Sequence, residues 1–152
     1  MPFVIFNVLL VGTSFGIAGF SIYLFTLETI KPLIEWGFLA VGIALLFLGI
    51  ASFWLKNSPG WLFCYLTFLF VSFSYMCVQE ILYFAMKPGL IDDATEPYAV
   101  KMQIEVDAAK KILEYNLKWG GLGFLICIAL AITTFTLGLC YRHSMLDADQ
   151  AT

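Results

Sequence analysis

Four long apolar runs, separated by short polar segments, make up most of the chain. Each run holds roughly the 20 residues that a helix needs to cross about 30 Å of hydrocarbon. The runs show no alternation of apolar and polar positions, which argues against β-barrel strands. We therefore predict an all-α membrane protein, a four-transmembrane-helix bundle forming one domain over 1–152, with spans at about 3–26, 34–55, 61–86 and 119–141.

Composition agrees with this pattern. The 152 residues are 61% hydrophobic and only 12% charged, which leaves too little polar surface for a water-soluble domain. The first run is too long for a secretory signal and has no Lys or Arg before it. We expect a multi-pass protein of the plasma or a vesicle membrane, or alternatively of an organelle inner membrane, with no nucleic-acid partner.

The connections between the runs differ in length. Lys-Asn-Ser-Pro-Gly at 56–60 predicts a tight turn, so the second and third helices should form an antiparallel hairpin. The third connection opens with KPGLIDDATEP at 87–97, which predicts another turn. It continues with apolar residues at helical spacing, which predict an amphipathic loop helix at about 98–118. Nothing breaks this pattern before Trp119, so the fourth helix should extend out of the bilayer.

Glycines carry the clearest packing signal within the runs. Gly12, Gly16 and Gly19 stand in the first run, and Gly42 and Gly49 stand seven residues apart in the second. Glycines at this spacing let the backbones of two helices approach closely along a common seam. The alternative is that glycine is simply common in membrane helices.

Gln79 and Glu80 place polar groups inside the third run. Glu80 lies about 10 Å along the helix axis from Lys87. An unpaired carboxylate at that depth is unfavourable, so we expect Glu80 to face the bundle and to pair with Lys118 or with a tyrosine hydroxyl such as that of Tyr23. We expect Gln79 to bond to a neighbouring helix or a partner subunit. The alternative is a proton or cation site, which we disfavour because no second acid, His or Arg is apparent inside the membrane to form a relay.

Asn7 and four cysteines are the other polar or reactive groups inside the spans. We expect Asn7 to make a hydrogen bond across a helix interface. Cys64 and Cys140 lie near helix ends, where palmitoylation and burial as small hydrophobes are both open. Cys77 and Cys127 are expected to be buried. The long loop has no cysteine, so it should hold together by packing alone.

No sequence motif for catalysis is present. The chain lacks a P-loop, a nucleophile elbow, a zinc-protease motif and any metal-spaced cluster of His and Cys. Its single histidine, His143, lies just past the fourth run and could not hold haem within the bundle. We predict that the protein is no enzyme, has no catalytic or metal-binding residues, and needs no cofactor other than structural lipids.

The layout and local sequence resemble the tetraspanin family. FNVLLVGTSFGIAGFSIYLF at 6–25 is similar to that family's Asn-bearing, glycine-rich first span, and GIALLFLGI at 42–50 is similar to its second. The acidic residue late in the third run is similar to the Gln or Glu often found there. The resemblance implies a membrane organiser that binds other membrane proteins laterally. The third loop departs from the family because it has no Cys-Cys-Gly, so the disulfide-braced recognition domain is absent or replaced.

Orientation and function each have two alternatives. Six of the eight basic residues lie on the side of the first and third loops, which would place those loops in the cytoplasm. The resemblance implies the opposite, with the termini in the cytoplasm. For function, the alternative to a tetraspanin-like organiser is a small accessory subunit of a large respiratory, photosynthetic, ATP-synthesising or channel complex. The short loop and its missing cysteines favour the accessory subunit.

Overall fold

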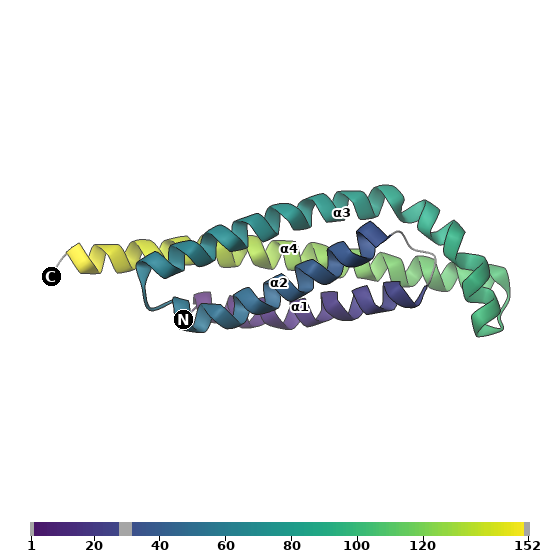
Figure 1. The fold of residues 1–152 in the computed structure, drawn as a ribbon, viewed down its shortest axis with the longest axis horizontal. Coiled ribbons are helices and arrows are strands. Elements are labelled where there is room, and N and C mark those ends of the chain that lie inside the picture. Colours follow the sequence, from purple (N-terminus) through teal and green to yellow (C-terminus); the bar gives the residue numbers. More distant parts are fainter. Residues whose placement is uncertain (1, 28–31, 151–152) are drawn as a thin grey trace.

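The structure is a computed structural model that describes residues 2–27 and 32–150. These residues form four helices and no strand, and each helix is long and apolar enough to cross a membrane. The prediction of an all-α four-helix bundle is confirmed, and the chain is a multi-pass integral membrane protein. The helices are α1 (Pro2–Thr26), α2 (Pro32–Leu55), α3 (Pro59–Met102) and α4 (Val106–Gln150) (Figure 1).

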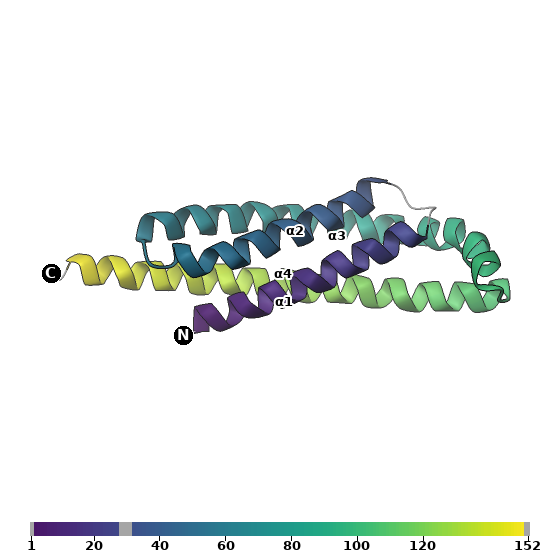
Figure 2. The same ribbon diagram turned by 60° about the horizontal axis from the view of Figure 1, so that its bottom comes forward.

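The helices pack as neighbours around a square. Helix α1 lies against α2 and α4, and α3 lies against α2 and α4 (Figure 2). Apolar side chains from all four helices fill the centre, among them Leu10, Phe38, Leu69 and Phe124. Buried positions recur three or four residues apart along most of each helix, and in α1 apolar residues alternate there with Asn7, Ser14 and Ser21. This spacing produces the inward-facing stripe that such a bundle requires.

Helices α1 and α2 match the spans expected from the sequence to within two residues. The turn before α3 also lies where it was predicted. Ser58 has an extended backbone and precedes Pro59, whose fixed φ suits the first position of a helix. The predicted first loop, with Lys31, lies partly outside the described residues.

The predicted turn at 87–97 is wrong, because this segment is helical and belongs to α3. Pro88 and Pro97 lie inside the helix, and α3 bends over the end of the bundle where they occur (Figure 1). Each proline removes one backbone N–H and crowds the preceding turn, which bends a helix. Packing keeps the segment helical, since it buries the side chains of Leu90, Ile91 and Ala94.

The predicted loop helix at 98–118 is also wrong as one unit, because the chain reverses within it. Helix α3 ends at Met102 and α4 begins at Val106. Gln103 takes a left-handed conformation with φ of 56° and donates its N–H to Val100 O at 3.3 Å, while Ile104 N–H donates to Ala99 O at 3.1 Å. These paired bonds close α3. The extension of the fourth helix out of the bilayer, by contrast, matches α4.

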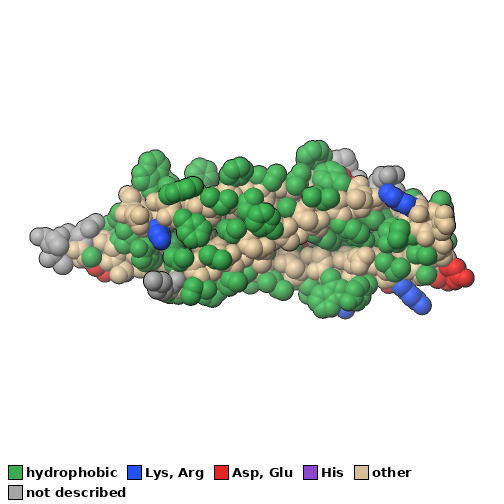
Figure 3. Space-filling model, turned by 90° about the horizontal axis from the view of Figure 1, so that it is seen from below, with side chains coloured by type: hydrophobic (Ala, Val, Ile, Leu, Met, Phe, Trp, Pro, Cys, Tyr) green, Lys and Arg blue, Asp and Glu red, His purple; other side chains and the backbone are tan. Residues whose placement is uncertain are grey.

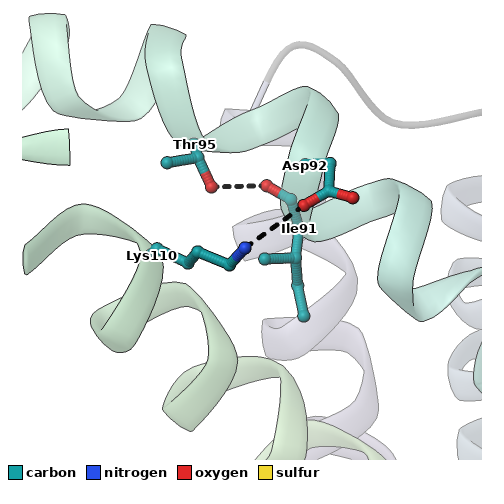
Figure 4. A network of polar contacts seen from close by, with 4 residues as sticks. All are labelled: Ile91, Asp92, Thr95 and Lys110. Carbon is teal, nitrogen blue, oxygen red and sulfur yellow. Dashed lines mark hydrogen bonds and ion pairs between the residues drawn. The ribbon is translucent and has the colours of Figure 1, made fainter. Parts of the chain in front are cut away.

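The end of α3 and the beginning of α4 therefore form a helical hairpin around Gln103 that extends beyond α1 and α2 (Figure 1). We call it the outer hairpin. An exposed ion pair joins Lys110 Nζ to Asp92 Oδ1 at 3.5 Å, and the Thr95 hydroxyl donates to Ile91 O (Figure 4). Exposed pairs contribute little to stability, so apolar packing holds the hairpin. In Figure 3 charged side chains gather toward the two ends, and the surface between them is largely apolar.

Candidate functional site

The buried face of α1 is defined by polar as well as apolar residues. Asn7, Ser14 and Ser21 stand seven residues apart and are all buried. The Ser14 hydroxyl donates to Val11 O within α1 at 2.6 Å, whereas the Ser21 hydroxyl donates to Glu35 O of α2 at 2.9 Å. The bond made by Ser21 therefore joins this face to α2.

Helix α2 supplies the glycines of that interface. A Cβ atom on Gly42 would lie 3.2 Å from the Ala18 nitrogen and 3.3 Å from Ser14 O, and a Cβ on Gly49 would overlap the side chain of Val11. The absence of side chains at these two positions thus permits the close approach of α1.

The predicted glycine seam is wrong for α1. A Cβ added to Gly12, Gly16 or Gly19 would meet nothing within 4 Å in the described part of the chain, and all three residues are exposed. They lie two residues away from Ser14 and Ser21 in sequence, which turns them about 160° away around the helix. The glycines of α1 therefore form an outward-facing strip, which we call the α1 glycine face.

A hollow of about 270 Å³ adjoins this face between α1 and α4. Gly16 lies on its α1 side, and Gly120 and Gly123 lie on its α4 side. The surrounding side chains are largely apolar, including Phe20 and Trp119. The α1 glycine face and this hollow together form a surface where another apolar molecule could approach the backbone.

Asn7 makes the cross-helix contacts that its position predicts. Its amide nitrogen donates to Gly49 O of α2 at 3.1 Å, and the Tyr65 hydroxyl of α3 donates to its amide oxygen at 2.8 Å. Asn7 and Tyr65 are each 1% exposed. The network joins three helices at the end of the bundle where α1 begins.

Gln79 and Glu80 are also buried, at 2% and 5% exposure. Gln79 faces α2, because a Cβ atom added to Gly37 would lie 2.5 Å from its amide group. The amide nitrogen of Gln79 donates to the Tyr75 hydroxyl of the same helix at 2.8 Å. Its amide oxygen and both oxygens of Glu80 have no hydrogen-bond partner among the described residues. Gln79 therefore bonds within its own helix and not to a neighbouring helix, while the alternative of a bond to a partner subunit stays a prediction.

The predicted partners of Glu80 are wrong. Lys118 is exposed, because that position of α4 faces away from the core. The Tyr23 hydroxyl accepts a hydrogen bond from the Asn116 amide at 3.1 Å, which joins α1 to α4 and leaves α3 aside. The nearby Tyr83 hydroxyl donates to Leu117 O of α4 at 2.5 Å. Glu80 thus lies buried in the bundle without a donor from these groups.

Sequence reasoning missed a second buried acid. Glu35 falls at the start of the predicted span at 34–55 and was not singled out, but it lies in the first turn of α2 and is 7% exposed. Because Gln79 lies against Gly37, Glu35 and Glu80 lie at similar depth toward the outer end of the bundle. The signal was available: Pro32 favours the first position of a helix, and acids are common in a first turn.

The cysteines divide between surface and core. Cys64 and Cys140 are exposed, so the alternative that they are buried is wrong, and palmitoylation stays a prediction. Cys127 is buried 3.4 Å from the Thr13 hydroxyl, and Cys77 is half-buried. The described residues contain no cluster of three or more His, Cys, Asp or Glu that could hold a metal ion.

Comparison of the chain with known family models, with characterised proteins and with solved structures finds no match.

Proposed function

We propose that this protein is a non-catalytic membrane scaffold that acts through lateral contacts with other membrane proteins, as the tetraspanin resemblance implies. The α1 glycine face carries the proposal. Gly12, Gly16 and Gly19 expose helix backbone, and Gly16 also lines the hollow between α1 and α4. In lipid, small residues at a helix surface allow the close packing that drives helix association.

Shape supports the same function. The outer hairpin of α3 and α4 projects beyond α1 and α2 and offers Val100, Met102 and Val106 as exposed apolar side chains around its turn. Exposed apolar groups in a water-facing segment are typical of contact surfaces. A small accessory subunit of a large complex is the second candidate, because this hairpin is cysteine-free and short, which suits a fixed site in an assembly.

The test compares Gly16→Leu with Ala40→Leu, which adds the same side chain to an exposed position of α2. Each variant is purified from its native membrane in mild detergent, and its mass and partners are measured. We expect Gly16→Leu to lower partner recovery about tenfold or more, which corresponds to about 1.4 kcal/mol of contact energy. Ala40→Leu should recover as much partner as the wild type.

Full partner recovery with Gly16→Leu, or a wild type that purifies without any other protein, would contradict the proposal. The masses also separate the two candidates. A fixed stoichiometry with many subunits supports the accessory subunit, and a heterogeneous set of membrane proteins supports the organiser. Gly42→Leu is the folding control, since its added side chain would collide with the α1 backbone and destabilise the bundle itself.

A further inference from the structure

The buried carboxyl group of Glu80 is not explained by lateral contacts. The side chain is 5% exposed, and neither oxygen has a hydrogen-bond partner in the part of the chain that the structure describes. An ionised carboxylate without donors is strongly unfavourable in an apolar interior, and such a group neutralises instead. Ionisable residues inside membrane helices are costly and typically functional.

In the described part of the chain, the helices packed against α3 do not supply a positive charge at this level. On α2 the buried ionisable group at a similar depth is Glu35, a second acid. On α4, Cys127 is paired with Thr13 of α1, and Lys118 is exposed. On α3 itself the Tyr83 hydroxyl proton is committed to α4. An ionised Glu80 would thus lie buried without a hydrogen-bond donor or a positive charge from these groups.

A metal ion does not fit this place. Hard cations take about six or more oxygen ligands. The only other unpaired buried oxygen among the described residues belongs to Gln79, whose amide lies against Gly37 of α2. Neither side chain lines the hollow between α1 and α4 or any of four further hollows of the described structure. The ligand that needs neither a cavity nor further oxygens is a proton.

We propose that Glu80 is a proton-binding site, a carboxylic acid that keeps its proton at neutral pH while the bundle is closed. Binding takes H⁺ from water and forms an O–H bond on one carboxyl oxygen. Release returns H⁺ to water and requires that the carboxylate reach water, which the packing of α2 and α4 against α3 opposes. Proton binding at Glu80 is therefore coupled to the closed packing of α3, independently of the α1 glycine face.

The test is infrared difference spectroscopy of the full-length protein in lipid vesicles near neutral pH. We expect the wild type to show the C=O stretching band of a protonated carboxylic acid and Glu80→Gln to lose it. Glu35→Gln, which changes the other buried acid in the same way, should keep that band. Loss of carboxylate bands with Glu80→Gln would overturn the proposal, as would a protonated-acid band that survives this substitution and disappears with Glu35→Gln.

A second measurement covers the case in which Glu80→Gln does not fold. Wild type and Glu35→Gln are labelled with ¹³C at the glutamate carboxyl carbons, and the protonation state of each carbon is read by infrared or magnetic resonance spectroscopy in vesicles. A protonated glutamate carboxyl that persists in Glu35→Gln supports the proposal. A spectrum in which every glutamate of the wild type is ionised overturns it.

Discussion

Helix α3 carries two buried polar sites whose hydrogen bonding differs. Toward its start, Tyr65 closes a network with Asn7 and Gly49 in which the amide of Asn7 both donates and accepts. Four turns further on, Gln79 and Glu80 leave three oxygens without a donor in the described structure. Asn7, Tyr65, Gln79 and Glu80 are each 5% exposed or less, so burial alone does not explain the difference in hydrogen bonding.

The chemistry of the neighbours explains it. An asparagine amide has a donor and an acceptor, and α2 and α3 offer it one of each. The carboxyl oxygens of Glu80 find no such donor among the described residues, because the nearby Tyr83 hydroxyl donates to Leu117 O instead. The first site therefore adds cohesion between three helices, while the second lowers stability. A site that persists despite its cost is the better candidate for a function beyond folding.

The sharpest way to break this comparison is Glu80→Met. It removes the unpaired carboxyl group and keeps a side chain of similar volume, so the free energy of unfolding should rise by about 2 kcal/mol. Detergent-driven unfolding in mixed micelles, followed by circular dichroism, measures the change. Glu96→Met, at an exposed position of α3, is the control and should change stability by less than about 0.5 kcal/mol. A fall in stability with Glu80→Met would show that the carboxyl group is held by a partner after all.

Asn7→Leu tests the other site and should have the opposite sign. The substitution leaves the buried Tyr65 hydroxyl without its acceptor and removes the bond to Gly49 O. The free energy of unfolding should fall by about 1 to 2 kcal/mol in the same assay. Asn57→Leu, in the exposed turn before α3, should leave it nearly unchanged. An equal loss from both variants would mean that the network contributes nothing specific.

Tyr65→Phe sharpens the assignment with a smaller change. The ring and its edge-to-face contact with Phe3 are kept, and only the hydroxyl that donates to Asn7 is lost. The free energy of unfolding should fall by about 0.6 kcal/mol, the average for such bonds between membrane helices. Combining it with Asn7→Leu should lower the free energy of unfolding by less than the sum of the two separate losses, because both changes remove the same hydrogen bond. Simple additivity would refute the network, and Tyr115→Phe, at an exposed position, is the matched control.

The helices themselves could be predicted because an apolar run of this length specifies a membrane span. The outer hairpin could not, since Pro88 and Gly89 are typical of a turn. There, tertiary packing of Leu90, Ile91 and Ala94 overrides the local preference. The reversal at Gln103 was missed for the converse reason, because apolar spacing continues across it and glycine, the residue most suited to a positive φ, is not used there.

The site was predicted less well because spacing does not tell which side of a helix faces a neighbour. Gly12 and Gly19 have the heptad spacing of a buried face but point outward. The better guide was polar: Asn7, Ser14 and Ser21 have the same spacing, and polar groups inside a membrane turn toward other helices. The lack of a partner for Glu80 in the described part of the chain could not be predicted from the sequence, because it depends on which hydrogen-bond donors of the neighbouring helices are already used.

Gly37→Ala has the smallest expected effect and tests whether Gln79 is held firmly. The added methyl group would lie 2.5 Å from the Gln79 amide. We expect this amide to move aside, because its only hydrogen bond in the described structure is to Tyr75 of the same helix. The gain of about 0.5 to 1 kcal/mol from replacing a helical glycine offsets that shift, so the free energy of unfolding should barely change. Gly42→Ala is the matched control, and it should lower stability because its methyl group meets the backbone of Ala18, which cannot swing away. If Gly37→Ala were as destabilising as Gly42→Ala, Gln79 would be fixed in place, and the contrast between a paired and an unpaired site on α3 would fail.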